Sequence, residues 1–180
     1  ILSGHPTIEV PGIEVNTGAL GHGLSIGVGM ALAAKMNHQS YKTYVLMGDG
    51  EQGEGSIYEA AMAANQYKLD NLVAIIDRNR LQISGTTEEV MANGDIYQRW
   101  TALGWDVKHM NGDNIEDIVN CFSEIDFESK RPHLLISHTT KGKGVSYMEN
   151  VTKWHHGVPN QEEFDLAIKE ISERIATLEK

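Results

Sequence analysis

Short apolar segments alternate with helical segments along this chain, and this alternation limits its fold more than any other feature. The run Leu72–Ile76 (LVAII) is apolar throughout and mostly β-branched, as is typical of a strand buried on both faces of a parallel sheet. Three more strands are expected, at Tyr44–Met47, Asp106–Met110 and His133–His138. Helical spacing of apolar residues predicts helices over Leu20–Met36, Ser56–Tyr67, Ile96–Leu103, Ile115–Phe127 and Gln161–Leu178. The pattern therefore predicts an α/β fold, a doubly wound, mostly parallel sheet with helices on both faces.

Small residues recur at a spacing of four in the first predicted helix, at Gly23, Gly27 and Ala31. Residues spaced by four lie on one face of a helix. Such a face suits close packing against the sheet and equally against another subunit, and the sequence leaves both open.

The composition argues against several classes of partner. The 180 residues include 15 Lys and Arg against 25 Asp and Glu, a net charge of −10, and the pI is near 5.2. This balance argues against nucleic acid or an anionic membrane as a partner, and no apolar run reaches the roughly 18 residues of a membrane span. The single cysteine, Cys121, cannot form an internal disulfide and fits a reducing cytoplasm. No repeat or linker divides the chain, so residues 1–180 are expected to form one domain.

The segment Gly48–Gly53 (GDGEQG) lies between a predicted strand and a predicted helix. Its glycines satisfy the G-x-G-x-x-G pattern of dinucleotide-binding loops, which alone is a weak signal. In that motif, bare backbone at a helix N-terminus meets a pyrophosphate. The carboxylate of Asp49 would repel the phosphates unless a cation lay between them. Asp49 therefore favours a metal-bridged diphosphate over NAD.

A second oxygen donor, Asn79, follows the next strand along the chain, in the segment Asp77–Leu81 (DRNRL). The carboxyl ends of neighbouring parallel strands lie side by side, and ligands of such sheets bind at this edge. Asp49 and Asn79 are therefore expected to face one ion. Mg²⁺ prefers octahedral oxygen ligands and commonly keeps phosphate oxygens among them. The alternative is that Asp49 caps a helix and Asn79 occupies an ordinary turn.

Further motifs extend this pattern over the chain. The segments GDGEQGEGSIYEA (48–60) and IIDRNRLQISG (75–85) resemble the thiamine diphosphate motif in its transketolase form. The segments SGHPTIEVPGIEVNTGALGHGLSIGVGMALA (3–33) and HTTKGKGVSYMENVTKWHHGVP (138–159) resemble transketolase segments before and after that motif. Because these motifs occur in order over essentially the whole chain, the sequence resembles the N-terminal thiamine-diphosphate-binding domain of transketolases, or the N-terminal subunit of a split transketolase.

The resemblance implies thiamine diphosphate and Mg²⁺ as cofactors. Asp49, the side chain of Asn79 and the carbonyl of Leu81 would ligate Mg²⁺. The backbone N–H of Gly50 would donate to the diphosphate. The other implied cofactor contacts are Gly48 at the diphosphate loop and, beside the thiazolium and aminopyrimidine rings, Gly18, Leu20 and Ile83.

Four more residues match family residues that handle protons or connect active sites. His5 and His156 match histidines that contact the cofactor or the substrate, and Glu54 and Glu59 match carboxylates of a network between the two active sites of a dimer, with Glu54 also at the cofactor. Other interpretations stay open. His5 could also lie in an exposed turn. Only the HG-x-P match selects His156 over His155. Glu54 and Glu59 lie at a predicted helix start, where acidic residues are favoured by the helix dipole in any case.

The implied reaction transfers a two-carbon ketol unit from a ketose phosphate to an aldose acceptor, as in the pentose phosphate pathway, with the cofactor carrying the hard chemistry. No stretch here corresponds to the family's first N-terminal segment, its activating glutamate, or its pyrimidine and C-terminal domains. The chain is therefore expected to supply the diphosphate and Mg²⁺ half of a site. It would need a pyrimidine-domain or C-terminal-subunit partner, in a homodimer or heterotetramer acting on sugar phosphates.

Three other functions are possible for such a sequence, and each has a feature that distinguishes it from a transketolase. An NAD-binding oxidoreductase domain using Gly48–Gly53 would bind NAD without metal. Deoxyxylulose-phosphate synthase shares the cofactor motif but lacks a good match to the WHHGVP ending. A non-catalytic assembly or regulatory domain would bind its partner with or without Mg²⁺ and cofactor.

Overall fold

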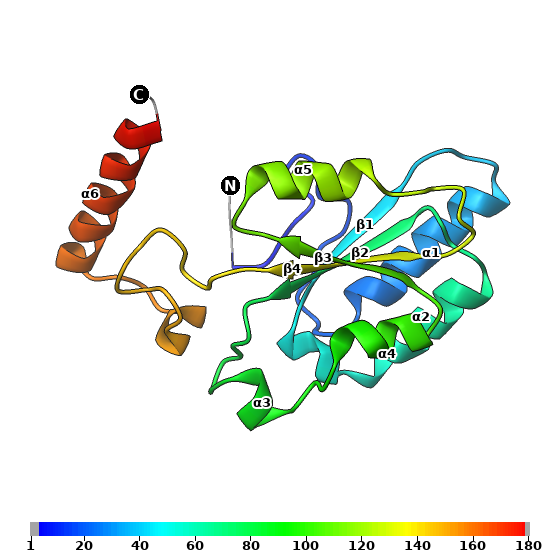
Figure 1. Cartoon of the computed structure of the whole chain (residues 1–180), viewed down its shortest axis with the longest axis horizontal. Helices are drawn as coiled ribbons and strands as arrows, with labels where there is room; N and C mark the ends of the chain where they lie inside the picture. The colour runs from blue at the N-terminus through cyan, green and yellow to red at the C-terminus, as the bar shows by residue number, and fades with distance from the viewer. Residues whose placement is uncertain (1–3, 179–180) are drawn as a thin grey trace.

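The computed structural model describes residues 4–178, built around a four-stranded sheet between helices (Figure 1). The strands pair in the order β1-β2-β4-β3, and every pairing is parallel. They are β1 (Thr43–Gly48), β2 (Leu72–Arg78), β3 (Asp106–Asn111) and β4 (His133–His138). The four predicted strands and the predicted fold class are confirmed.

Three helices pack on one face of the sheet, α1 (Gly23–Met36), α2 (Gly55–Gln66) and α4 (Ile96–Ala102) (Figure 1). From β2, Leu72, Ala74 and Ile76 point into this layer and are fully buried. The rings of Trp100 and Trp105 meet edge to face in the same core, with centroids 4.7 Å apart. Burial of these large side chains supplies the main driving force for this layer.

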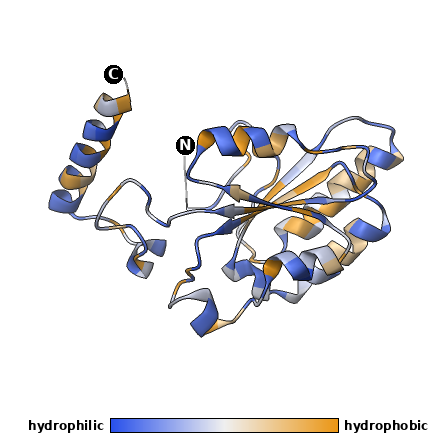
Figure 2. Ribbon diagram, viewed as in Figure 1, coloured by the Kyte–Doolittle hydropathy of each residue, from blue (hydrophilic) through white to orange (hydrophobic). Residues whose placement is uncertain are grey.

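A single helix, α5 (Ile115–Ser123), covers the other face (Figure 1). The alternate residues of β2 point toward it, and Val73 packs with Met110, Cys121 and Leu135 in a second, smaller core. The thiol of Cys121 is thus part of the packing. Figure 2 shows the hydrophobic residues concentrated along the strands, between the two helical layers. Burial on both faces explains why β2 is apolar without alternation.

The first helix begins three residues later than predicted, at Gly23, because Gly21 has φ +79°, outside the right-handed helical region. The small-residue face packs on the sheet. A Cβ built at Gly27 would collide with a methyl carbon of Val45 and lie 3.5 Å from one of Leu72. Of the two uses left open for this face, the structure therefore shows packing within the domain.

The last helix, α6 (Gln161–Leu178), has the predicted bounds but stands apart from the sheet layers (Figure 1). It is held by the preceding loop, where the Tyr147 hydroxyl donates to the Glu163 carbonyl at 2.7 Å and Ser146 N donates to Glu170 at 2.7 Å. Short elements that the sequence did not predict are η1 (Gly50–Gly53), α3 (Thr87–Val90) and η2 (Thr152–His155). None of the helices over residues 4–178 has the length and apolar content to cross a membrane.

Candidate functional site

The four strands end at one edge of the sheet, and the loops that follow them meet there. Gly48 pairs with Asp77, and His138 pairs with both Arg78 and Asn111, so the carboxyl ends are in register. Open parallel sheets bind their ligands at this edge. The loops after β1 and β2, which carry the predicted metal ligands, are neighbours because β1 and β2 are adjacent strands.

Asp49 is the buried charge of this edge, with 1% of its surface exposed. Its Oδ2 accepts from the backbone N of Arg80 at 2.6 Å and from Arg78 Nη1 at 3.1 Å. Its carbonyl accepts from Asn93 Nδ2 at 2.8 Å. Burial raises the pKa of Asp49 above its usual 3.8, and the bonds from Arg80 and Arg78 oppose this without cancelling it.

Arg78 connects the Asp49 loop to α3. Besides Asp49, its guanidinium donates to Thr87 Oγ1 at 2.8 Å and to Glu88 Oε1 at 3.0 Å. The start of α3 is fixed by a capping box between Thr86 and Glu89. One side chain therefore holds the loop after β1 and the loop after β2 together.

Asn79 and Leu81 lie in the turn that follows β2. Asn79 Oδ1 accepts from Leu81 N at 3.0 Å, and Leu81 forms an isolated antiparallel bridge with Thr86. Arg80, which donates to Asp49, lies between them in the chain. The structure thus places the three predicted metal ligands in two touching loops.

The turn Gly18–Gly21 is joined to the same edge by Glu51. One carboxylate oxygen of Glu51 accepts from Gly21 N at 2.8 Å and the other from Gly48 N at 3.0 Å. Ser56 Oγ donates to the Gly21 carbonyl at 2.7 Å. The turn expected beside the cofactor rings is therefore fixed relative to the Asp49 loop.

Two apolar side chains expected beside the cofactor rings are left open to solvent. Leu20 is 58% exposed and Ile83 is 62% exposed. An apolar ligand surface placed against them would remove this area from water.

The four residues expected to handle protons or link sites fall into two groups. The ring of His5 lies 3.5 Å from the position of a Cβ built at Gly18, and the side chain of Glu54 lies against Gly21. Glu59 is exposed on α2. His156 is exposed after η2, where its ring meets that of His155 edge-on at 5.5 Å. Among the described residues, no hydrogen bond, ion pair or ring contact joins Glu59 or His156 to the Asp49 loop.

The donor set suits a hard cation held jointly with a ligand. It offers one carboxylate, one side-chain amide oxygen and one backbone carbonyl, and over residues 4–178 no three His, Cys, Asp or Glu side chains gather as metal ligands. Mg²⁺ is commonly bound by one or two carboxylates and completed by phosphate oxygens and water. A Cβ built at Gly50 would lie 3.0 Å from the Gln82 side chain, so a larger residue beside Asp49 would press on Gln82. These features fit Mg²⁺ and a diphosphate.

A second hollow, of about 560 Å³, lies at the ends of β3 and β4. There His109 Nδ1 and His138 Nε2 form a hydrogen bond of 2.9 Å, and the ring of Tyr97 stacks on His109. Burial lowers the pKa of His138, and the nearby charge of His109 lowers it further.

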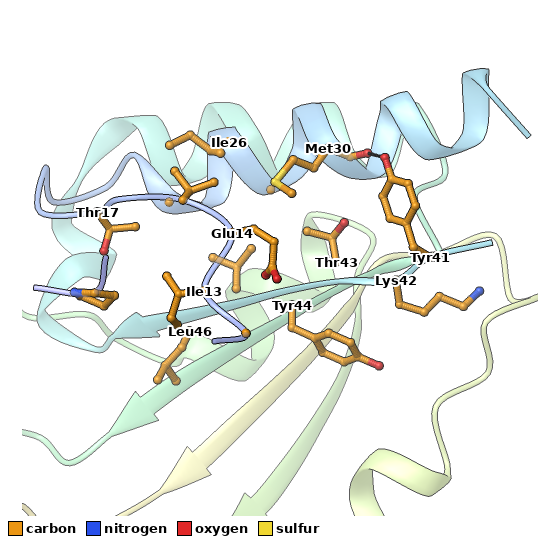
Figure 3. A pocket seen from close by; sticks show the side chains of 16 residues that line it. Ile13, Glu14, Thr17, Ile26, Met30, Tyr41, Lys42, Thr43, Tyr44 and Leu46 are labelled. Atoms are coloured by element: carbon orange, nitrogen blue, oxygen red, sulfur yellow. Dashed lines mark hydrogen bonds between the residues drawn. The ribbon is translucent and has the colours of Figure 1, made fainter. Parts of the chain in front are cut away.

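A cavity of about 740 Å³ lies between α1, β1 and the segment before α1 (Figure 3). Figure 3 shows Ile13, Ile26 and Met30 among its lining side chains, with the Tyr41 hydroxyl donating to the Met30 carbonyl at 3.1 Å. None of the predicted site residues lines it.

Four residues at the site were not singled out by the sequence analysis: Glu51, Arg78, Gln82 and Asn93. Arg78 and Gln82 are next to predicted ligands in the chain, and Glu51 lies inside the segment GDGEQG. Their closeness in sequence to predicted site residues could therefore have indicated them. Asn93 is 44 positions from Asp49, and no local pattern points to it.

Comparison with known proteins gives a family. The family model described as "Transketolase, thiamine diphosphate binding domain" matches residues 2–173. An apulose-4-phosphate transketolase subunit of Phocaeicola vulgatus is 77% identical over 180 residues, which are 100% of this chain and 64% of that protein. A protein of the same name from Actinobacillus succinogenes is 46% identical over 173 residues, 96% of this chain and 62% of the relative.

A solved structure gives the same result. The crystal structure of transketolase from Campylobacter jejuni superposes with a TM-score of 0.85 at 35% identity, covering 94% of this chain and 28% of that one. The chain therefore spans less than two thirds of the length of each of these proteins.

Proposed function

Since the chain belongs to the transketolase family through its thiamine diphosphate binding domain, we propose that it supplies the diphosphate and Mg²⁺ half of an active site that transfers a two-carbon ketol unit from a ketose phosphate to an aldose. The observation that carries the proposal is Asp49. The pKa of this buried carboxylate, at a strand end beside Gly50 and Asn79, stays raised even with its ion pair to Arg78, and a bound Mg²⁺ would offset the remaining cost of burying the charge.

Each residue has a defined task in this proposal. Asp49, the Asn79 side chain and the Leu81 carbonyl hold Mg²⁺, while Gly50 donates its N–H to the diphosphate. Thiamine diphosphate, when bound, supplies the carbanion-stabilising chemistry that side chains lack. Gly18, Leu20, Gly48 and Ile83 complete the proposed cofactor contacts. The exposed side chains of Leu20 and Ile83 exclude water from the reacting ring by packing on it.

The proton-handling residues complete the proposal. We assign His5 and His156 to proton transfer at the substrate hydroxyl and carbonyl oxygens, with His156 also at the cofactor. The contact of His5 with Gly18 supports its place near the site. We assign Glu54, also at the cofactor, and Glu59 to the carboxylate network between paired sites. The contact of Glu54 with Gly21 supports its part.

The substrate and the partner are proposed from the relatives. Two of them are named as one subunit of an apulose-4-phosphate transketolase. We therefore propose apulose 4-phosphate as the ketose donor, instead of a ketose phosphate of the pentose phosphate pathway. A relative that is named as one subunit of an enzyme supports a second, complementary subunit, which would carry the pyrimidine domain in a dimer or heterotetramer. Residues 1–180 would act as one domain in that assembly, in the cytoplasm.

Calorimetric titration of thiamine diphosphate into the chain, with Mg²⁺ and then with EDTA, tests the cofactor half of the proposal. Asp49→Ala is the site control, and a titration of NAD tests the alternative use of Gly48–Gly53. We expect binding that requires Mg²⁺ and is lost in Asp49→Ala. NAD binding without metal, and no thiamine diphosphate binding, would refute the proposal.

Reconstitution tests the partner half. The chain, with the family's first N-terminal segment restored and mixed with the complementary subunit of an apulose-4-phosphate transketolase, is expected to gain ketol transfer from apulose 4-phosphate and to gain cofactor affinity. Complex formation indifferent to Mg²⁺ and cofactor, without activity, would support a non-catalytic assembly domain instead.

A further inference from the structure

One donor at the carboxyl edge of the sheet has no partner. Gln82 Nε2 is buried and makes no hydrogen bond within residues 4–178. The other buried side-chain atoms in this condition are at or just before the start of a strand, at the opposite edge: Thr43 Oγ1, Asn71 Oδ1 and His133 Nε2. Gln82 is therefore the member of this set that lies where ligands of such sheets bind.

The side chain of Gln82 lies directly over Gly50. A Cβ built at Gly50 would be 3.0 Å from Cγ, 3.1 Å from Cδ and 3.3 Å from Oε1 of Gln82. Gly50 follows Asp49 in the chain and is the proposed donor to the diphosphate. The Gln82 side chain thus packs on Gly50, next to the proposed diphosphate donor.

The backbone holds Gln82 in this position. Gln82 N donates to the Gly85 carbonyl at 2.8 Å, and the bridge between Leu81 and Thr86 closes the same turn. A buried N–H without a partner is unfavourable, and a side chain whose backbone is already held in a turn loses less freedom when an acceptor arrives. An anion beside Gly50 would supply the missing acceptor.

We propose that Gln82 is a further cofactor-binding residue, whose Nε2 donates to an oxygen of the diphosphate group of thiamine diphosphate. This inference rests on the function proposed above and adds a contact to it. A neutral amide suits this position because Mg²⁺ already offsets the diphosphate charge, so a further cation is unnecessary. The bond is made to the diphosphate and not to the rings, so it predicts discrimination among thiamine derivatives.

The test compares Gln82→Met with the wild-type chain, in whichever form, alone or with the complementary subunit, the wild type binds the cofactor. Methionine keeps the length and flexibility of the side chain and removes the amide. Gln98→Met, on the exposed surface of α4, is the matched control. Calorimetry with Mg²⁺ measures the Kd of thiamine diphosphate, of inorganic pyrophosphate and of thiamine, and urea unfolding without ligand measures stability.

We expect Gln82→Met to raise the Kd of thiamine diphosphate and of pyrophosphate at least tenfold, a loss of about 1.4 kcal/mol, and to leave that of thiamine unchanged. Its unliganded stability should equal or exceed that of the wild type, because the unpaired donor is gone. A purely structural role would instead lower stability and weaken all three ligands together. Gln98→Met should change none of these quantities.

The outcomes separate this inference from the proposed function. If the wild type binds thiamine diphosphate with Mg²⁺ and Gln82→Met binds it within twofold of the same Kd, the inference is wrong and the proposed function stands. If thiamine diphosphate binds neither to the wild-type chain nor to its complex with the complementary subunit, the proposed function is wrong and the inference with it.

Discussion

Replacing Asp49 by asparagine should stabilise the metal-free protein while abolishing Mg²⁺ binding. The carboxylate is 1% exposed, and burial raises its pKa above 3.8 despite the bonds from Arg80 and Arg78. Asparagine has the same shape and keeps an oxygen for the Arg80 N–H, but it carries no charge. Arg78 keeps its ion pair with Glu88 at 3.0 Å, so the substitution does not leave it as an isolated cation.

The magnitude follows from the balance of burial and pairing. Because folding raises the pKa of Asp49, the ionised carboxylate is less stable in the folded protein than a neutral group would be, and each pKa unit between the folded and unfolded states corresponds to about 1.4 kcal/mol. Asp49→Asn also gives up the charge-assisted bond to Arg78, so we expect a small net gain, about 1 kcal/mol at pH 7. For a chain of this length that is a rise of roughly 2–4 °C in Tm.

The pH dependence has a defined sign. The folded pKa of Asp49 is above the unfolded value, so the folded state binds this proton more tightly, and the penalty of the buried charge grows as pH rises through the folded pKa. The advantage of Asp49→Asn should therefore be full at pH 8 and shrink toward pH 4.

Thermal unfolding followed by circular dichroism, in EDTA between pH 5 and pH 8, measures this difference. Asp165→Asn, on the exposed surface of α6, is the control and should leave Tm unchanged. Adding Mg²⁺ and thiamine diphosphate should raise the Tm of the wild type alone. A lower Tm for Asp49→Asn at pH 7 would show that pairing with Arg78 outweighs burial, and the reasoning would fail.

Three further predictions concern single side chains. Arg78→Met should lower the metal-free unfolding free energy by about 3 kcal/mol in urea titrations, because it leaves the neighbouring buried carboxylate without its counter-charge; an unchanged midpoint would contradict this. Gly21→Ala should cost about 2 kcal/mol, since its φ is +79° and a Cβ there would lie 2.7 Å from side-chain atoms. Gly29 is the matched position in α1, where a built Cβ would meet no neighbouring atom within 4 Å. Gly29→Ala should raise the free energy of unfolding by up to about 1 kcal/mol. The pKa of His138 should be below 6.5 when measured by NMR titration. The free energy of unfolding should therefore fall as pH falls through 6.5, because the unfolded chain binds this proton more tightly than the folded protein does. His109→Gln should raise the pKa of His138.

Most of the fold was predictable because burial leaves a pattern in the chain. Leu72–Ile76 is apolar without interruption because both faces of β2 are covered, and β4 was predicted with its exact bounds for the same reason. Helix ends were less predictable. The chain before Gly23 has helical spacing, but the positive φ of Gly21 and its bond to Glu51 hold it in a turn.

The site divides in the same way. Asp49, Gly50 and Asn79 could be predicted from sequence as candidate site residues because oxygen donors and glycines that follow strands have local signatures, and parallel pairing brings strand ends together whatever the side chains are. Arg78 and Gln82 stand beside predicted ligands in the chain, but nothing in the sequence gives their partners, and Asn93 has no local signature. Their roles depend on distances across loops.

The sequence by itself therefore determined the layers, the edge where the candidate ligands lie, and the chemical types of those candidates. Only the tertiary structure decided which charge is buried, which side chain pairs with it, and which donor is left without a partner. Hydrogen bonds and burial depend on positions in space fixed to a few tenths of an ångström. Residues as far apart as Asp49 and Asn93 acquire such positions only when the whole sheet has formed.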